Sequence, residues 1–349
     1  MAKPLQFGIV GCGVIAPSHI ESLRLQENVS VTWVCDLVRE KAESRAAKYG
    51  CEHVTRDYRE VLDDPEVDAV CVCTDHASHV AITVDALDAG KHVLCEKALA
   101  SDREGLVRMF AARDRNPEVL FGAVFQHRFD PEYSYLKQLI DEGRFGTLLT
   151  GAVHVRCLRT DEYYTADQWR GTWAEEGGAV LINQAIHFID ALLWVTGGVA
   201  AVCGTHANMT HNRSMEAEDT ASAILRFRSG AIGTLEATCS SHLTWEPTLL
   251  IHGTEGSIEL RDGKPIKLAF SDAAFTDEAL AHFRQCEDSR TETVGKTYYG
   301  TGHPAQIADF CDAIRDGREP HVSADSARET VETVLAIYQS HREQGWVNL

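Results

Sequence analysis

Apolar and polar residues alternate in blocks along the first 125 residues of the chain. Short apolar runs of this kind are typical of strands buried on both faces of a parallel sheet. Six such runs cover residues 5–10, 29–35, 53–55, 67–74, 92–95 and 120–125. Segments of helical composition separate them at residues 16–27, 38–49, 58–62, 78–89 and 101–115. This alternation predicts an α/β fold, a doubly wound parallel sheet with right-handed crossovers.

The pattern changes after residue 125. Helical segments are predicted over residues 131–142 and 177–195, and a strand over residues 147–159. Strand-like runs then follow one another without helices between them, at residues 199–207, 220–227, 231–238, 248–253 and 257–260. Helices return over residues 303–343 and could pack back on the first domain.

A chain of 349 residues favours two domains. We expect an α/β domain over residues 1–125 and an α+β domain with an open, mainly antiparallel sheet over residues 126–349. Hydrophobic residues make up 44% of the chain, as in ordinary soluble proteins, and no apolar stretch reaches the roughly 20 residues of a membrane span. The first apolar stretch is a strand rather than a secretory signal, which favours a cytoplasmic location.

The net charge of −19 argues against nucleic acid as a partner, because non-specific binding of nucleic acid requires a basic surface. Local arginines can still bind one anionic ligand. The eleven cysteines show no spacing typical of a metal site and lie mostly in apolar runs. We therefore expect buried, reduced thiols and no bound metal.

The first apolar run ends in GCGVIA at residues 11–16, which fits the pattern G-x-G-x-x-[GA] of a dinucleotide-binding turn. In such a turn Gly11 allows the tight bend and Gly13 lets the backbone approach a pyrophosphate. Val14 and Ile15 then lead into a helix N-terminus, where unpaired N–H groups attract phosphate. The motif predicts a bound dinucleotide.

An acidic residue, Asp36, closes the second apolar run about 20 residues after the glycines. Its carboxylate can accept hydrogen bonds from the adenosine ribose and repels a 2′-phosphate, which favours NAD over NADP. Arg39 weakens this preference. Because ligands of such sheets lie at the carboxyl ends of the strands, we expect further cofactor contacts from the residues Thr74, His76, His79, Glu96 and Lys97.

Two places in the chain could carry chemistry. Lys97 is either an ordinary surface lysine or a proton donor and acceptor at the cofactor, and its position after the fifth strand favours the second interpretation. Asn183, His187 and Asp190 follow the spacing i, i+4, i+7 and would share one face of an apolar helix. They form either an internal hydrogen-bonded patch or a catalytic site in which His187 takes an alcohol proton.

Four segments together resemble the Gfo/Idh/MocA family of oxidoreductases: GCGVIA at 11–16, TDHASH at 74–79, AGKHVLCEKALA at 89–100 and GGAVLINQAIHFID at 177–190. The resemblance covers nearly the whole chain. It implies a Rossmann domain and a C-terminal domain whose open sheet forms homodimers or homotetramers. It also implies NAD(P)-dependent oxidation of sugars, inositols and related alcohols, with Lys97 and His187 as the catalytic lysine and histidine.

Two departures from the family pattern bear on the site. Ala98 stands where the family usually has proline, beneath the nicotinamide, so the shape of the backbone there is open. Asn183 occupies the position that is aspartate in inositol dehydrogenases, and an asparagine can orient a hydroxyl but cannot relay a proton. We therefore expect no Lys–Asp–His proton relay.

Four features of the second part of the chain are QHRF at 126–129, YY at 163–164, WRGTW at 169–173 and NQ at 183–184 before His187. Together they look like those of the branch that contains UDP-N-acetyl-2-amino-2-deoxyglucuronate dehydrogenase, which oxidises a sugar 3-hydroxyl. This resemblance adds Gln126, Trp169 and Arg170 to the expected cofactor contacts. The expected substrate contacts are Lys97, Arg128, Arg156, Tyr163, Asn183, Gln184 and His187. Arginines suit a carboxylate or a diphosphate, although each of Arg128, Arg156, Arg159 and Arg170 could equally form a structural ion pair.

The favoured interpretation is an NAD-dependent dehydrogenase. It would move a hydride from a ring hydroxyl, at C3, of a sugar or nucleotide sugar to the nicotinamide. The sequence leaves open which of Lys97 and His187 is the base. Inositol or an unactivated glycoside is an alternative substrate, and an NAD-using glycosidase or a non-catalytic sugar sensor is an alternative from another class.

Overall fold

The computed structural model describes residues 3–288 and 301–349, and the chain divides into two compact units. The first comprises Met1–Gln126 and Glu292–Arg328, and the second comprises His127–Thr291 and Glu329–Leu349. The chain thus returns to the first unit before it completes the second, so the second unit is not one continuous stretch. All eleven cysteines carry free thiols, and nine are buried. None of the described helices is long and apolar enough to cross a membrane.

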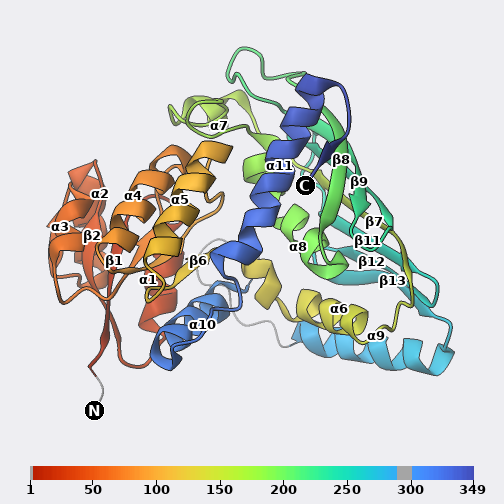
Figure 1. Cartoon of the computed structure of the whole chain (residues 1–349), viewed down its shortest axis with the longest axis horizontal. Helices are drawn as coiled ribbons and strands as arrows, with labels where there is room; N and C mark the ends of the chain where they lie inside the picture. The colour runs from red at the N-terminus through yellow and green to blue at the C-terminus, as the bar shows by residue number, and fades with distance from the viewer. Residues whose placement is uncertain (1–2, 289–300) are drawn as a thin grey trace. The chain divides into compact units, whose positions relative to one another are not determined.

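The first unit contains a six-stranded parallel sheet with the strand order β3-β2-β1-β4-β5-β6 (Figure 1). Its strands are β1 (Leu5–Val10), β2 (Val29–Cys35), β3 (His53–Thr55), β4 (Ala69–Val72), β5 (His92–Cys95) and β6 (Phe121–Ala123). This order confirms the predicted doubly wound topology. Successive strands are added on one side of β1 up to β3 and on its other side from β4 onward, so the strand order switches at β1. Ligands of such sheets bind at the carboxyl ends of the strands beside this point.

Helices cover this sheet (Figure 1). They are α1 (Ala16–Arg24), α2 (Arg39–Tyr49), α3 (Tyr58–Asp63), α4 (His76–Asp88), α5 (Arg103–Arg115) and α10 (His303–Asp316). Helix α10 packs against α1, and its Phe310 joins Phe7, Ile9 and Leu23 in one buried core. A helix from far along the chain therefore completes the core of the first unit.

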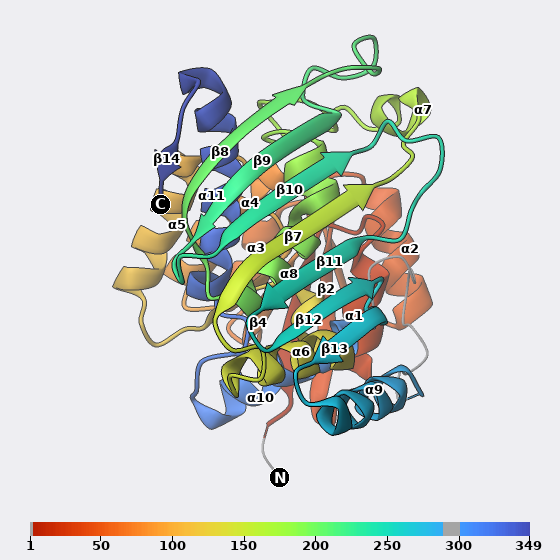
Figure 2. The same cartoon turned by 90° about the vertical axis from the view of Figure 1, so that its right-hand side faces the viewer.

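The second unit contains an eight-stranded sheet with the order β13-β12-β11-β7-β10-β9-β8-β14 (Figure 2). Its strands are β7 (Leu148–Arg156), β8 (Val199–Ala207), β9 (Thr220–Phe227), β10 (Ile232–Thr238), β11 (Thr248–Gly253), β12 (Gly256–Arg261), β13 (Lys264–Phe270) and β14 (Val347–Asn348). Strands β7 and β10 are parallel, and the other neighbouring strands are antiparallel. The prediction of a mainly antiparallel sheet is confirmed, but the pattern does not predict β13, which exposes most of its residues, or the two-residue β14.

Helices pack on one face of this sheet, and the opposite face, called here the open face, exposes side chains of the described residues. A Cβ at Gly151 of β7 would lie 3.2 Å from Leu192, so α8 packs on this face. Ile224 and Ile232 lie on the opposite face and are exposed. Figure 2 looks onto the sheet with α8 and α11 behind it. The remaining helical segments are η1 (Gln126–Phe129), α6 (Pro131–Asp141), α7 (Asp161–Thr165), η2 (Val180–Ala185), α8 (Ile186–Thr196), α9 (Ala273–Asp288) and α11 (Ala324–Glu343).

Candidate active site

The loop after β1 has the properties of a phosphate-binding turn. Gly11 has a φ of +96°, and a Cβ there would lie 2.5 Å from the backbone carbonyl of Cys73, so only glycine fits. A Cβ at Gly13 would meet no atom within 4 Å, so the backbone of this residue borders open space. Val14 is exposed, and Ile15 is the N-cap residue of α1. An accessible backbone beside a helix N-terminus fits the pyrophosphate of NAD.

Two side chains from neighbouring segments hold this loop. Asp36, directly after β2, accepts hydrogen bonds from the backbone N–H groups of Cys12 (2.8 Å) and Val38 (2.8 Å) through different oxygens. Arg45 of α2 donates to the carbonyl oxygens of Cys12 (3.4 Å) and Gly13 (3.2 Å). The structure therefore brings Asp36 to the glycine loop. Arg45 was missed, because one arginine on a highly charged helix gives no signal in the sequence.

Lys97 follows β5 at the same edge of the sheet, next to a buried carboxylate. Oε1 of Glu96 lies 2.8 Å from Nε2 of His19, and Oε2 accepts a hydrogen bond from the backbone N–H of Lys97 (3.2 Å). Burial favours the neutral form of Glu96, but the His19 hydrogen bond and the charges of His303 and Lys97 outweigh it, so the pKa of Glu96 is lowered. The peptide bond between Lys97 and Ala98 is cis. Glu96 thus acts as an ionised support for the Lys97 segment.

His79 joins the segments that follow β4 and β5. Its two ring nitrogens face the carbonyl oxygens of Ala98 (2.7 Å) and Thr74 (3.2 Å), and burial lowers its pKa. The ring is completely buried and both nitrogens are engaged, so it holds these two segments together, and its contact with a cofactor stays a prediction. His76, the first residue of α4, lies 5.7 Å from His79 between ring centroids. Gln126, at the start of η1, is also completely buried.

In the second unit, His187 lies in the first turn of α8, directly after the π-helix η2. Its ring packs edge-on against His127, with the centroids 5.7 Å apart. Nδ1 of His127 lies 2.5 Å from Oδ2 of Asp130. All three side chains are buried. A second imidazole with a carboxylate behind it therefore contacts the predicted catalytic histidine.

The three polar residues of this region lie in two helical segments of different kinds, whereas their spacing predicts one continuous α-helix. Asn183 lies in the π-helix η2, whereas His187 and Asp190 lie in α8, so the α-helical period does not run through all three. The side-chain amide of Asn183 donates to Glu176, and Asp190 pairs with Arg128. Asn183 therefore bonds a residue that precedes η2, and Asp190 bonds a residue of η1.

Two arginines predicted to bind substrate are engaged elsewhere. Arg128 and Asp190 form a bidentate pair (2.8 and 2.6 Å) that is buried, and the Thr330 hydroxyl donates to the same carboxylate (2.8 Å). Arg156 forms a bidentate pair with Glu236 (2.6 and 2.9 Å) on the open face of the sheet, opposite α8. A carboxylate of the same unit already occupies each guanidinium fork, which is the structural ion pair that the sequence leaves open as the alternative to a substrate contact.

The remaining predicted residues of the second unit gather around Tyr163 of α7. Gln184 of η2 donates to the Tyr163 hydroxyl (3.0 Å) and accepts a hydrogen bond from Arg159 (2.6 Å). The guanidinium carbons of Arg159 and Arg170 lie 5.2 and 4.4 Å from the centre of the Tyr163 ring. Arg170 also lies 5.0 Å from the Trp169 ring. The structure thus places two cationic groups and two aromatic rings beside the segment that leads to His187.

A buried carboxylate that the sequence does not reveal holds the start of η2. Glu218 accepts hydrogen bonds from the backbone N–H groups of Ala179 (3.0 Å) and Leu181 (2.9 Å) and from the Tyr338 hydroxyl of α11 (2.8 Å). Gly178 has a φ of +142°, and a Cβ there would lie 2.1 Å from the Tyr338 hydroxyl, so this approach requires glycine. Burial raises the pKa of Glu218 to about 7.

We expect Glu218 to make stability depend on pH. Between its ordinary pKa of 4.5 and its folded pKa of about 7, the folded protein retains a proton that the unfolded chain has lost. Raising the pH through this window therefore lowers the free energy of unfolding, by about 2–3 kcal/mol between pH 5 and pH 8. Glu218→Gln cannot titrate at this position. As the pH rises from 5 to 8, urea unfolding should therefore show its free energy of unfolding increasing by about that much relative to the wild type. Glu216→Gln, an exposed neighbour, is the control, and a pH-independent difference would contradict the assignment.

The first unit has the sheet and glycine loop of a dinucleotide-binding domain, and the second has a histidine on a helix beside a polar cluster. These features define a two-domain, dinucleotide-dependent oxidoreductase. Residues 5–123 match the oxidoreductase family's NAD-binding Rossmann fold, and residues 137–349 match its C-terminal alpha/beta domain. The chain therefore belongs to the Gfo/Idh/MocA family of oxidoreductases, which confirms the resemblance predicted from its motifs.

Relatives that match this chain over nearly the whole of both sequences are named as dehydrogenases of sugars and polyols. The levoglucosan dehydrogenase of Pseudarthrobacter phenanthrenivorans is 26% identical over 99% of this chain and 98% of its own. The myo-inositol 2-dehydrogenase of Thermotoga maritima is 24% identical over 99% and 98%. The crystal structure of the WlbA dehydrogenase from Bordetella pertussis with NADH and UDP-GlcNAcA is similar with a TM-score of 0.91 and 28% identity, covering 100% of this chain and 99% of that one. These likenesses agree with the predicted branch of the family.

Proposed function

We propose that the protein is an NAD-dependent dehydrogenase that oxidises a ring hydroxyl, at C3, of an acidic sugar or nucleotide sugar. The observation that carries this proposal is the cluster of Arg159, Tyr163, Arg170 and Gln184 on the segments next to His187. Two guanidinium groups near one tyrosine ring suit the carboxylate or diphosphate of such a substrate, although Nε of Arg170 also donates to Asp167 at 2.7 Å. The similar WlbA dehydrogenase, whose structure holds NADH and UDP-GlcNAcA, supports the same substrate class.

The chemistry requires a hydride acceptor and two groups that handle the hydroxyl proton. NAD, when bound, supplies the acceptor for the hydride that leaves the alcohol carbon. We assign the proton to Lys97 and His187: one takes it from the hydroxyl, and the other polarises the oxygen. Glu96 supports the backbone of Lys97, and His127 packs against the ring of His187. These neighbours hold the two reactive groups in place, which is how orientation contributes to the rate.

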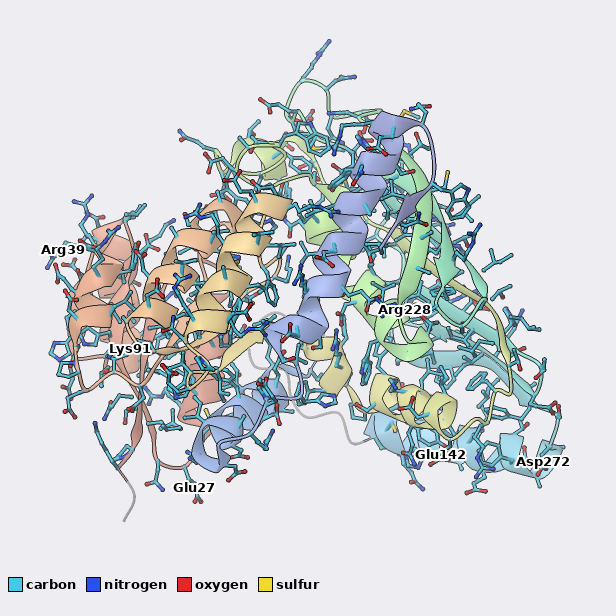
Figure 3. All side chains as sticks on the ribbon, viewed as in Figure 1. Glu27, Arg39, Lys91, Glu142, Arg228 and Asp272 are labelled. Carbon is cyan, nitrogen blue, oxygen red and sulfur yellow. The ribbon has the colours of Figure 1, made fainter. Side chains whose placement is uncertain are left out.

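The charges after β2 favour NAD over NADP. Asp36 is held by two backbone N–H groups, so its carboxylate stays where an adenosine ribose would meet it. Arg39, at the start of α2, is exposed (Figure 3). Its Nε donates a hydrogen bond to Glu43 at 2.7 Å. With its guanidinium committed to this pair, Arg39 weakens the preference for NAD less than the sequence alone suggests.

The open face of the second sheet favours a homodimer or a homotetramer. It carries the exposed side chains of Ile224 and Ile232, 48% and 59% accessible, together with the Arg156–Glu236 pair. Exposed apolar side chains on a flat sheet face are suited to covering by another copy of the same chain. Light scattering on the purified protein would measure the assembly.

A thermal-shift and absorbance screen tests the proposal. We expect NAD to raise the melting temperature more than NADP at the same concentration, because the ligand with the lower Kd stabilises the folded protein more. A ligand at about 100 times its Kd stabilises a protein by about 2.7 kcal/mol. Among free sugars, inositols, sugar acids and UDP-sugars, the acidic nucleotide sugars should give the fastest growth of the reduced-nicotinamide absorbance. Faster reduction with inositol or levoglucosan would contradict the substrate class.

The same screen separates the alternatives from other classes. An NAD-using glycosidase would release an aglycone without net reduction of NAD. A non-catalytic sensor would show thermal shifts with cofactor and sugar but neither product. Either result would replace the dehydrogenase.

A further inference from the structure

Glu218 accepts hydrogen bonds from three consecutive backbone N–H groups at the start of the helical segment that carries His187. Its two carboxylate oxygens accept from the N–H groups of Ala179 (3.0 Å) and Leu181 (2.9 Å), and its backbone carbonyl accepts from Val180 (3.2 Å). The first N–H groups of a helix have no partner within the helix itself. One residue from outside the helix therefore satisfies three of them in succession.

The sheet of the second unit holds this residue in place. Glu218 is 1% exposed and lies two residues before β9, an interior strand of the sheet. The next residue, Asp219, donates its backbone N–H to Ala207 of β8 (3.1 Å) and accepts a hydrogen bond from Cys239, directly after β10 (2.9 Å). The start of η2 is therefore fixed to three neighbouring strands.

The position of this first turn determines where the following residues lie, because η2 continues directly into α8. The backbone N–H of Asn183 donates to the carbonyl of Ala179 (3.0 Å), which links the first turn to the next. Gln184 of η2 contacts Tyr163, and His187 follows in the first turn of α8. A shift of the start of η2 would therefore move both the predicted anion-binding cluster and the predicted catalytic histidine.

The groups that contact the Glu218 carboxylate match its ionised form. Two are backbone N–H groups, which can only donate, and the third is the hydroxyl of Tyr338 (2.8 Å). A carboxylate accepts from all three, whereas a protonated carboxyl group brings a hydrogen that needs an acceptor of its own. Burial opposes ionisation and raises the pKa of Glu218 to about 7, so both forms are populated within the working pH range.

Resting on the proposed function, we propose that Glu218 is a positioning residue whose ionised carboxylate holds η2 in the form that presents His187 for the reaction. Protonation removes the cost of burying the charge, but it also breaks a contact that the first turn of η2 needs. Stability and activity therefore change in opposite directions with pH: the more stable protonated form is the less active one.

The other ionisable groups around this carboxylate do not obscure a test by pH. Burial raises the pKa values of Tyr338 and Cys239 far above neutral pH. Burial opposes ionisation of Asp219, but hydrogen bonds from backbone N–H groups outweigh it and lower its pKa to about 2. His206 packs against the Tyr338 ring, and burial lowers its pKa to about 4. The charged or titratable groups one contact further away are common to every variant below: Glu176, His341 and Arg342.

Two variants test the proposal in the full-length protein. Glu218→Gln keeps the shape of the side chain but turns an NH₂ group toward a backbone N–H, and Tyr338→Phe removes one of the three donors. Glu216→Gln makes the same chemical change at an exposed residue and is the control. From pH 6 to pH 8.5 we would measure kcat and KM on the best substrate of the screen, urea unfolding, and hydrogen exchange of the amides of residues 179–187 without any ligand.

At pH 8.5 we expect Glu218→Gln to lower kcat by about tenfold or more and to speed exchange at residues 179–181 relative to the wild type at the same pH. The Kd for NAD should stay within a few-fold, because we expect the first unit to bind it. The deficit in kcat should shrink to about twofold at pH 6, where about nine-tenths of the wild type is itself protonated. Over the same pH range the stability of the variant should fall relative to the wild type as the pH is lowered.

Tyr338→Phe should move the pH dependence of kcat without abolishing it. The Tyr338 hydroxyl favours the ionised carboxylate, so its removal should shift the rise of kcat upward by about one pH unit. A residue with a purely structural role would not produce this shift. The control should match the wild type in every measurement.

Each measurement can overturn the proposal. A loss of kcat in Glu218→Gln that is the same at every pH, or a profile of Tyr338→Phe that coincides with the wild type, would leave Glu218 a purely structural residue. Unchanged exchange at residues 179–181 would show that the carboxylate does not hold η2. If the wild type oxidises no alcohol, the role toward His187 falls together with the proposed function, while exchange and unfolding still decide whether the ionised carboxylate holds this turn.

Discussion

Lys97→Met is expected to lower kcat for sugar oxidation by about 10³-fold while leaving the Kd for NAD within a few-fold of the wild type. Methionine keeps the aliphatic stem of the side chain but removes the ammonium group, and a positioned acid or base contributes about 10²–10⁴-fold to a rate. We expect most of the affinity for NAD to come from other groups, the open backbone at Gly13 and the carboxylate of Asp36. Steady-state kinetics and NAD titration measure the two effects separately.

The control for this variant is Lys41→Met, an exposed lysine on α2 of the same unit. It makes the same chemical change at a residue that no prediction places in the site, and it should retain wild-type kcat. Turnover by Lys97→Met within a few-fold of the wild type would remove Lys97 from the reaction. A parallel loss of NAD affinity would instead make Lys97 a cofactor ligand.

Asp190→Ala is expected to destabilise the second unit by about 3–5 kcal/mol. The variant leaves the guanidinium of Arg128 buried without its bidentate partner, and an unpaired buried charge is costly. The Arg128 guanidinium lies 5.9 Å from the centre of the Trp194 ring, so urea unfolding followed by tryptophan fluorescence reports on this region. The double variant Arg128→Met/Asp190→Ala should recover part of the loss, because it removes both charges.

The ion pair of Arg156 and Glu236 joins the same chemical groups as the pair of Arg128 and Asp190, but it is exposed rather than buried. It has bidentate geometry as well, but both side chains are about 40% exposed. Glu236→Ala should therefore cost about 1 kcal/mol or less. Equal losses in Asp190→Ala and Glu236→Ala would show that burial does not set the energy of these pairs.

The sequence predicts the fold well, because the evidence for it is local. Each buried strand of the first unit leaves an apolar run of its own, and the residues that follow these runs must meet at one edge of a parallel sheet. Asp36 and Lys97 could be placed in this way. The exposed strand β13 shows the limit of the method, because its apolar residues follow no clear alternation.

Side-chain partners distant in sequence could not be predicted. Arg128 and Asp190 are 62 residues apart, and Arg156 and Glu236 are 80 apart, so nothing local shows that these arginines are already paired. Glu176 and Glu218 are two of 52 acidic residues and become distinctive only when the fold buries them. The π-helix η2 also interrupts the α-helical spacing on which the face shared by Asn183 and His187 was based.

The return of the chain to the first unit limits how this enzyme can be recombined with its relatives. Gln306 of α10 donates to the carbonyl of Ala123 (2.7 Å), and the backbone N–H of Ala123 donates to Val322 (3.3 Å). Phe310 of the same helix is part of the core beneath β1. A chimera that exchanged only residues 1–126 would set a foreign sheet against a native helix. The first unit is therefore encoded by two separate segments of the gene. A chimera that keeps this unit intact must exchange both segments together.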